Sequence, residues 1–92
     1  MADYIKDIER FREKLNENTT WPLKYMFKFI VPNKDGKVEQ VKDILSDVGN
    51  LSFKHTKNLK FVSVTCVGEM NNADEIISLT IEVTSIEGVM AL

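Results

Sequence analysis

Cysteine is nearly absent from this chain of 92 residues, in which Cys66 is the only one. No intrachain disulfide can form, and no Cys-x-x-Cys pair is present to hold a metal or to carry redox chemistry. Cys66 itself falls in the inward-facing set of an alternating segment, which predicts a buried packing residue rather than a reactive thiol. We therefore expect a reducing, cytoplasmic location, no metal site and no cofactor.

Long apolar runs are also missing. The longest apolar stretches, around residues 25–31 and 61–68, are far shorter than a membrane span. The N-terminal sequence MADYIKD has acidic residues where a signal peptide would be basic. Neither export nor a membrane partner is predicted.

No charge of one sign predominates. Lys and Arg number 12 against 14 Asp and Glu, which gives a net charge of −2, and no run of like charge occurs. This balance argues against a nucleic acid or a membrane surface as a partner held by electrostatics alone. A chain of this length builds one small core, so any site lies on that domain or between copies of it.

Histidine and arginine are too scarce for most catalytic sites. His55 is the only histidine and has no cysteine or carboxylate cluster near it in the sequence, so we interpret it as a solvated strand residue. Both arginines, Arg10 and Arg12, precede the first expected strand, whereas acylphosphatase-like enzymes need an arginine beside the loop that follows it. We expect no enzymatic activity, because no pair of nucleophile and base can be assembled.

What the chain does contain is a clear succession of hydrophobic periods after Trp21. They predict a strand at 24–31, a helix at 38–48, strands at 51–57 and 59–68, a helix at 73–83 and a strand at 89–92. This order is typical of the α+β ferredoxin-like βαββαβ plait, a four-stranded antiparallel sheet with two helices on one face. In that topology the first and third strands are central and the other two are edges.

Local signals add detail to this plan. Asn72 and Glu75 resemble a capping box for the second helix. Gly49-Asn50 predicts a left-handed end of the first helix, and Lys57-Asn58 predicts a tight hairpin turn. In the first strand, one set of alternating residues is expected to lie under the helices: Tyr25, Phe27, Phe29 and Val31.

An appended N-terminal helix is predicted over residues 3–17, so we divide the chain into a helix and linker at 1–20 and a domain at 21–92. Its apolar stripe consists of Tyr4, Ile8, Phe11 and Leu15. The stripe either folds back on its own domain or forms a surface for a partner or a second copy. A homodimer is also expected through the sheet edges or the open sheet face, because the short last strand is an unguarded edge.

The loop at 32–37 is the one place where a glycine precedes a helix N-terminus. Free backbone N–H groups there favour a carboxylate-bearing ligand, so Asn33, Asp35 and Gly36 are candidate ligand-binding residues. An ordinary connection between strand and helix is the alternative interpretation.

RNA-recognition domains share this topology and present aromatic residues from the central strands. The segment KNLKFVSV at 57–64 keeps the basic start and the first aromatic residue of their motif, but it lacks two of three aromatics and the glycine. An RNA-binding module using Phe61 and Lys28 on the open sheet face is therefore the alternative function.

Four short motifs resemble the YbeD-like proteins, small bacterial proteins of unassigned function: WPLKYMFK at 21–28, VEQV at 38–41, FVSVT at 61–65 and VMAL at 89–92. The resemblance implies a ferredoxin-like plait similar to the amino-acid-binding ACT domain, and a regulatory role. Two positions depart from the family pattern, because the hairpin turn lacks its glycine and Thr80 replaces a tyrosine. We expect a non-enzymatic regulatory or adaptor domain that binds a small metabolite or a protein partner.

Overall fold

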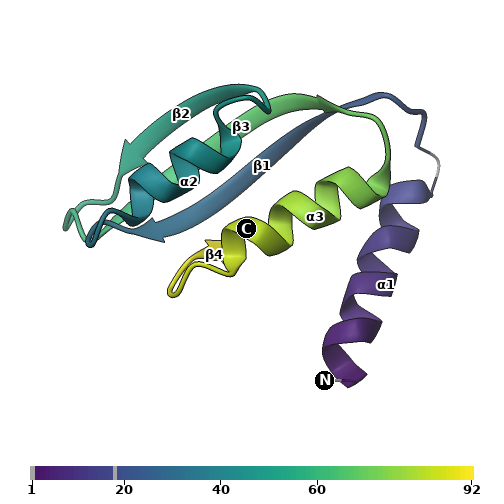
Figure 1. Ribbon diagram of the computed structural model, residues 1–92, viewed down its shortest axis with the longest axis horizontal. Coiled ribbons are helices and arrows are strands. Elements are labelled where there is room, and N and C mark those ends of the chain that lie inside the picture. The colour runs from purple at the N-terminus through teal and green to yellow at the C-terminus, as the bar shows by residue number, and fades with distance from the viewer. Residues whose placement is uncertain (1, 18) are drawn as a thin grey trace.

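The computed structural model describes residues 2–17 and 19–92, with side chains from residue 7 onward. The elements follow the order that the hydrophobic periods predict (Figure 1): α1 (Ala2–Asn16), β1 (Leu23–Pro32), α2 (Lys37–Leu45), β2 (Asn50–His55), β3 (Phe61–Met70), α3 (Ala73–Thr84) and β4 (Met90–Ala91). The four strands form one sheet in the order β2-β3-β1-β4, and every neighbouring pair is antiparallel. The fold is α+β, and β1 and β3 occupy the centre of the sheet as predicted.

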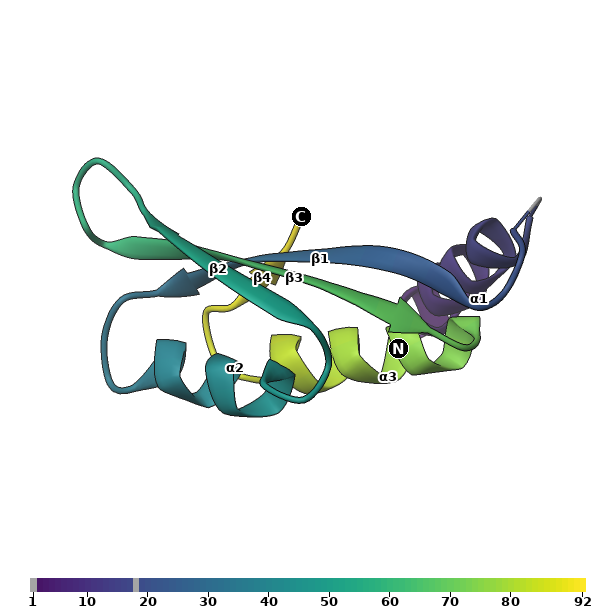
Figure 2. The ribbon, with the colours of Figure 1, turned by 90° about the horizontal axis from the view of Figure 1, so that it is seen from above.

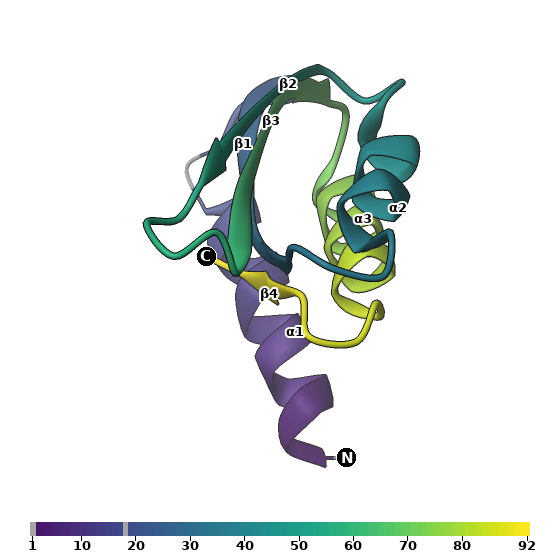
Figure 3. The same cartoon turned by 90° about the vertical axis from the view of Figure 1, so that its left-hand side faces the viewer.

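Two helices cover one face of this sheet and leave the other face open. Figures 2 and 3 show α2 and α3 on the same side of the strands, with α1 at one end of the molecule. The alternation of β1 explains this arrangement, because Phe27 and Phe29 are buried while Lys24 and Lys28 are exposed. A strand with one apolar and one polar face can bury only the apolar face, so the helices gather there.

The core lies between the sheet and these two helices. It is purely apolar, with no buried polar residue among those described. Its members are Phe27, Phe29, Val31, Val41, Leu45, Val62, Val64, Cys66, Met70, Ile76, Val83 and Val89. Cys66 is fully buried, as predicted, and its burial raises the pKa of the thiol.

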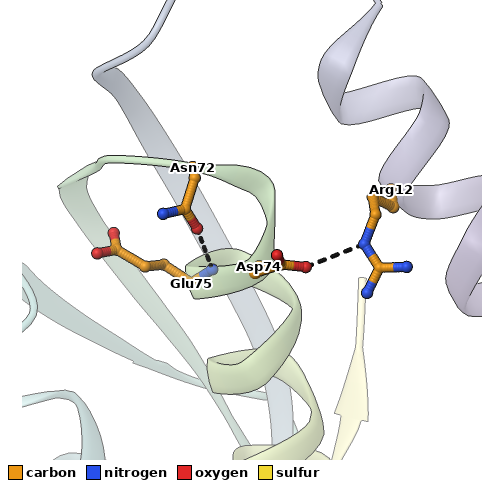
Figure 4. Close-up of polar contacts among 4 residues, drawn as sticks. All are labelled: Arg12, Asn72, Asp74 and Glu75. Carbon is orange, nitrogen blue, oxygen red and sulfur yellow. Dashed lines mark hydrogen bonds and ion pairs between the residues drawn. The ribbon is translucent and has the colours of Figure 1, made fainter.

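Helix α3 begins with the capping interaction that the sequence predicts (Figure 4). The side-chain oxygen of Asn72 accepts a hydrogen bond of 2.9 Å from the backbone N–H of Glu75. The returning bond goes one residue further back than in a standard capping box, because the Glu75 carboxylate accepts from the backbone N–H and side-chain amide of Asn71 at 2.7 and 3.1 Å. These bonds lower the pKa of Glu75.

Helix α1 packs on its own domain beside α3. The Nε of Arg12 donates to the carboxylate of Asp74 at 2.9 Å (Figure 4), and Phe11 and Leu15 lie half-buried against the core. For these two apolar residues the structure supports the interpretation that the stripe folds back. The chain then reaches β1 through a linker in which the Trp21–Pro22 peptide bond is cis.

Several boundaries differ from the prediction. The expected left-handed end at Gly49 is wrong, because α2 ends at Leu45 and the glycines with positive φ are Gly36 and Gly88. The turn between β2 and β3 is wider than Lys57-Asn58 and includes Leu59 in the left-handed region, with φ of 60°. The last strand is shorter than 89–92.

Candidate functional site

A groove of about 660 Å³ lies at the end of the sheet where four connections meet. It is bounded by the end of β1, the β2–β3 turn, the start of α2 and the connection from α3 to β4. We call it the basic groove and define it by its lining: Pro32, Asn33, Lys34, Lys37, Leu59, Lys60, Phe61, Glu87, Gly88 and Met90.

Asn33 ties two sides of the basic groove together. Its backbone N–H donates to the carbonyl of Lys60 at 2.9 Å, and its side-chain amide donates to the carbonyl of Leu59 at 3.0 Å. The β1–α2 loop is thereby attached to the β2–β3 turn. The turn is itself braced, because the side chain of Asn58 accepts from the hydroxyl of Thr56 and from the backbone N–H of Lys60.

A lysine and a glycine form the opposite side. The Nζ of Lys37 donates to the backbone carbonyl of Glu87 at 2.8 Å, which links the first turn of α2 to the connection after α3. Gly88 then turns the chain with φ of 87°, and a Cβ there would come within 2.8 Å of Cγ of Pro32. Only glycine combines a positive φ with the lack of a Cβ atom that this close approach to Pro32 requires.

The groove combines positive charge with an apolar floor. Its lining has three lysines against one carboxylate, although the whole chain has a net charge of −2. Leu59, Phe61 and Met90 line it and remain 61%, 37% and 58% exposed. Among the residues that the structure describes, neither Lys34 nor Lys60 belongs to an ion pair. Ammonium groups above exposed apolar surface suit an anionic ligand with an apolar body.

The predicted ligand residues are only partly gathered here. Asn33 lines the basic groove, whereas Asp35 and Gly36 lie exposed in the adjacent loop and do not contribute to the lining. Gly36 is the N-cap of α2 in a left-handed conformation, and no side chain caps this helix. The site role of these three residues stays a prediction.

Sequence reasoning missed the residues that come from distant connections. Lys60 and Phe61 reach the groove because Phe61 pairs with Pro32 in the β1–β3 ladder. Glu87 and Met90 reach it because β4 pairs with β1. The strand order predicts this proximity in outline, but periodicity gives no reason to select one exposed lysine over another.

A second hollow of about 530 Å³ is acidic rather than basic. It lies beside the start of α3, and its carboxylates come from Asp47, Glu69, Asp74 and Glu75. Asp74 is paired with Arg12, and Glu75 is bonded to Asn71. Two of the four carboxylates thus serve the docking of α1 and the cap of α3.

The other candidate residues lie apart from the basic groove or are unreactive. His55 is exposed on β2, as predicted, and in the described part of the chain no three His, Cys, Asp or Glu side chains are placed so that they could hold a metal ion together. Cys66 is buried with a raised pKa, which disfavours the reactive thiolate. These positions favour a packing role for Cys66 and a solvent-exposed role for His55.

The two residues predicted for RNA binding do share the open sheet face. Phe61 pairs with Pro32, and Lys28 pairs with Thr65, so the two side chains stand four register positions apart. At the rise of a strand this separation is about 13 Å. Lys24 and Met26 are also exposed on this face, nearer the start of β1.

The predicted partner stripe on α1 is largely used within the domain. Phe11 and Leu15 pack against the core, and Ile8 is half-buried. The side chain of Tyr4 lies outside the described residues. A partner role for this stripe stays a prediction that concerns its N-terminal part.

Comparison with known proteins identifies a family. A family model described as "Protein of unknown function (DUF493)" matches residues 16–92. No curated protein and no solved structure matches the chain. Over the range that the structure describes, none of the helices combines the length and apolar character that crossing a membrane requires.

Proposed function

The chain belongs to the DUF493 family, of which YbeD is also a member, and we propose that it is a non-enzymatic domain that binds a small anionic metabolite in the basic groove. The predicted relationship to YbeD-like proteins is confirmed by this membership. The observation that carries the proposal is the meeting of three lysines above exposed apolar side chains in one groove.

The physical argument rests on two complementary interactions. A ligand carboxylate or phosphate gains charge-assisted hydrogen bonds from Lys34 and Lys60. Its apolar part covers Leu59, Phe61 and Met90, which would otherwise remain in water. Lys37 keeps its bond to the Glu87 carbonyl and maintains the shape of the groove.

The lining also favours binding over catalysis. Its side chains include no hydroxyl, thiol or imidazole, and all lining residues belong to the described part of the chain. Its titratable groups are three lysines and Glu87. Covalent catalysis requires a nucleophile aligned with a base, and among the described residues no lysine of the groove is paired with the Glu87 carboxylate, which supports a binding role.

We further propose that the fold is a ferredoxin-like plait similar to the ACT domain, and that the protein acts as a regulatory domain in the cytoplasm. The element order from β1 to β4, the central positions of β1 and β3, and two helices on one face support this assignment. The lone buried cysteine suits a reducing compartment. A homodimer through the sheet edges is part of this proposal.

A thermal-shift screen tests metabolite binding. The purified protein is heated with amino acids, nucleotides and straight-chain carboxylates, each carboxylate being compared with its neutral primary amide. A free ligand concentration of 100 times Kd stabilises the folded state by about 2.7 kcal/mol, which in a domain of this size gives a rise of roughly 10–20 °C in Tm. We expect carboxylates to raise Tm and their amides to leave it unchanged.

Matched variants locate the effect. Lys34→Glu combined with Lys60→Glu is expected to abolish the shift, whereas Lys54→Glu on β2, outside the groove lining, is expected to retain it. Asp35→Ala tests the predicted loop residue separately. A screen without any shift, or a shift that survives the double reversal, contradicts the proposal.

RNA binding through the open sheet face is the second candidate, favoured by the exposed Lys24, Lys28 and Phe61 on that face. Single-stranded RNA bound there would lose affinity steeply as salt is raised. Lys28→Glu separates the two functions, since Lys28 does not line the basic groove. RNA binding would be lost in that variant, while the thermal shift with a carboxylate would persist.

A further inference from the structure

Strand β1 is only partly covered on the side where β4 pairs with it. β1 spans Leu23–Pro32, whereas the two residues of β4 pair only with Phe29 and Ile30. One additional bond of 2.9 Å runs from the backbone N–H of Leu92 to the carbonyl of Lys28. Among the residues that the structure describes, no strand lies beside the first half of β1 on this side of the sheet.

The uncovered part of β1 presents backbone hydrogen-bonding groups. In an antiparallel ladder, alternate residues direct both their N–H and their C=O to the same neighbouring strand. Because the carbonyl of Lys28 faces β4, the backbone groups of Met26 and Lys24 face the same side. Within residues 2–17 and 19–92, no hydrogen bond from another element reaches these groups on that side. Such a row of free donors and acceptors is a template for an added strand.

A hollow of about 320 Å³ lies beside this row. We call it the edge slot; it is lined by Phe11 of α1, residues 25–29 of β1, Thr80 of α3 and residues 91–92. Figure 1 shows α1 beyond the start of β1 and β4 near its end, with α3 passing between them. The edge slot therefore has walls at both ends and a helix beneath it.

We propose that the edge slot binds an extended acidic segment of a partner protein, which adds to the sheet as a strand beside the first half of β1. This site is separate from the basic groove and does not depend on the function proposed for it. Main-chain hydrogen bonds to Met26 and Lys24 supply the affinity that is independent of sequence. The side chains of alternate positions supply specificity.

The charge on the open face determines which segment fits. Lys24 and Lys28 are exposed there on either side of Met26; Glu69 of β3 stands opposite Lys24, but neither lysine is in an ion pair among the described residues. Side chains of an added strand would stand about 4.5–5.5 Å from them, which is within reach of a cation–carboxylate pair. The partner therefore has acidic residues on this face.

On the opposite face the added strand meets aromatic rings. Tyr25 and Phe27 lie there with ring centroids 4.8 Å apart, and Phe11 closes the end of the slot. Apolar side chains fit this surface. The predicted partner is thus a segment in which acidic and apolar residues alternate.

A second copy of this chain fits the edge slot poorly. A second copy could offer two free strand edges: the same first half of β1, which carries Lys24 and Lys28, and β2, which carries Lys54 and His55. Lys54 pairs with Ser63 on the open face, so it would stand on the same face as Lys24 and Lys28. Like charges side by side oppose either pairing.

A synthetic peptide tests the proposal directly. The probe is a fluorescein-labelled peptide of alternating valine and glutamate, about eight residues long, which is an ordinary strand length. Binding is measured by fluorescence anisotropy and located by amide hydrogen exchange of the intact protein. We expect saturable binding with new protection at Met26 and Lys24. A peptide that fails to bind at millimolar protein, or that protects β2 instead, overturns the proposal.

Charge reversal and proline provide the controls. Lys24→Glu combined with Lys28→Glu should lower the affinity for the valine–glutamate peptide by about tenfold. A valine–lysine peptide should bind this variant more tightly than it binds the native protein. Lys54→Glu should change nothing. Two central prolines in the peptide remove backbone donors and should abolish binding. Equal binding of the proline peptide, or an equal loss of peptide affinity in Lys54→Glu, would contradict strand addition by a partner at the edge slot.

Discussion

Gly49 and Gly68 lie against each other where the connection after α2 crosses β3. A Cβ atom at Gly49 would overlap the carbonyl oxygen of Val67, and one at Gly68 would overlap the carbonyl oxygen of Val48. Both obstacles are backbone atoms, so no side-chain rotation can relieve the overlap. These two glycines set how closely the connection between α2 and β2 sits on a central strand.

Replacing either glycine should destabilise the protein strongly. We expect Gly68→Ala to lower the free energy of unfolding by about 3 kcal/mol, the upper range for forced overpacking. Gly36→Ala is the matched comparison, because its φ is 70° but a Cβ there meets nothing within 4 Å. Its cost should be about 1–2 kcal/mol, from the left-handed backbone alone. Urea denaturation measures both values, and similar losses in the two variants would contradict the role of the close approach.

At the scale of elements, the start of α3 makes stability depend on pH. The pKa of Glu75 is lowered by hydrogen bonds from the backbone and then the side chain of Asn71. A carboxyl group with a lowered pKa in the folded state stabilises that state above its unfolded pKa of about 4.3. The contribution is lost as the pH falls through the lowered value in the folded state.

The variant Glu75→Gln isolates this effect. At pH 7 we expect it to melt at a lower temperature than the native protein, because a neutral amide accepts weaker bonds than a carboxylate. The difference in Tm should shrink as the pH falls below the unfolded pKa of about 4.3 and then through the lowered pKa of the folded state. Thermal unfolding between neutral and acidic pH measures this difference. A gap in Tm that stays constant with pH would contradict the role of the ionised group.

The attachment of α1 is predicted to depend on apolar contact rather than on its ion pair. Arg12 and Asp74 are 42% and 73% exposed, and pairs so accessible to water contribute at most about 1 kcal/mol. Phe11 is half-buried against the core. Phe11→Ala should therefore speed amide hydrogen exchange in α1 more than Arg12→Ala does, while exchange in β3 changes little. The reverse order would assign the docking of α1 to electrostatics.

Elements were predictable from the sequence to the extent that local pattern determines them. Alternation in β1 and the Asn72 cap act within a few residues, so both were predicted correctly. The end of α2 was predicted wrongly, because a glycine is needed at position 49 for close approach to the backbone of β3 and not for ending the helix. Likewise, pairing with β1 determines the length of β4, and a local pattern cannot show where that pairing stops.

At the scale of the whole molecule, the candidate site results from connections that only the complete sheet brings together. Asn33 was predictable because it follows a strand and precedes a helix. Lys60 and Glu87 were not, since they join it through the β2–β3 turn and the α3–β4 connection. The edge slot was missed for the same reason, because it depends on the mismatch between a long central strand and a short neighbour.

The rate at which a thiol reagent labels Cys66 measures how often the core of the molecule opens. The thiol is fully buried in β3 and burial raises its pKa, so a thiol reagent at neutral pH can react only after the core opens. We expect Phe11→Ala, which releases α1 alone, to leave the labelling rate of Cys66 nearly unchanged. Gly68→Ala destabilises the central sheet, so it should speed labelling by about a hundredfold if it costs about 3 kcal/mol and opening is in rapid equilibrium. Equal acceleration in the two variants would mean that α1 and the sheet unfold as one unit, and the division between the N-terminal helix and the domain at 21–92 would then have no energetic basis.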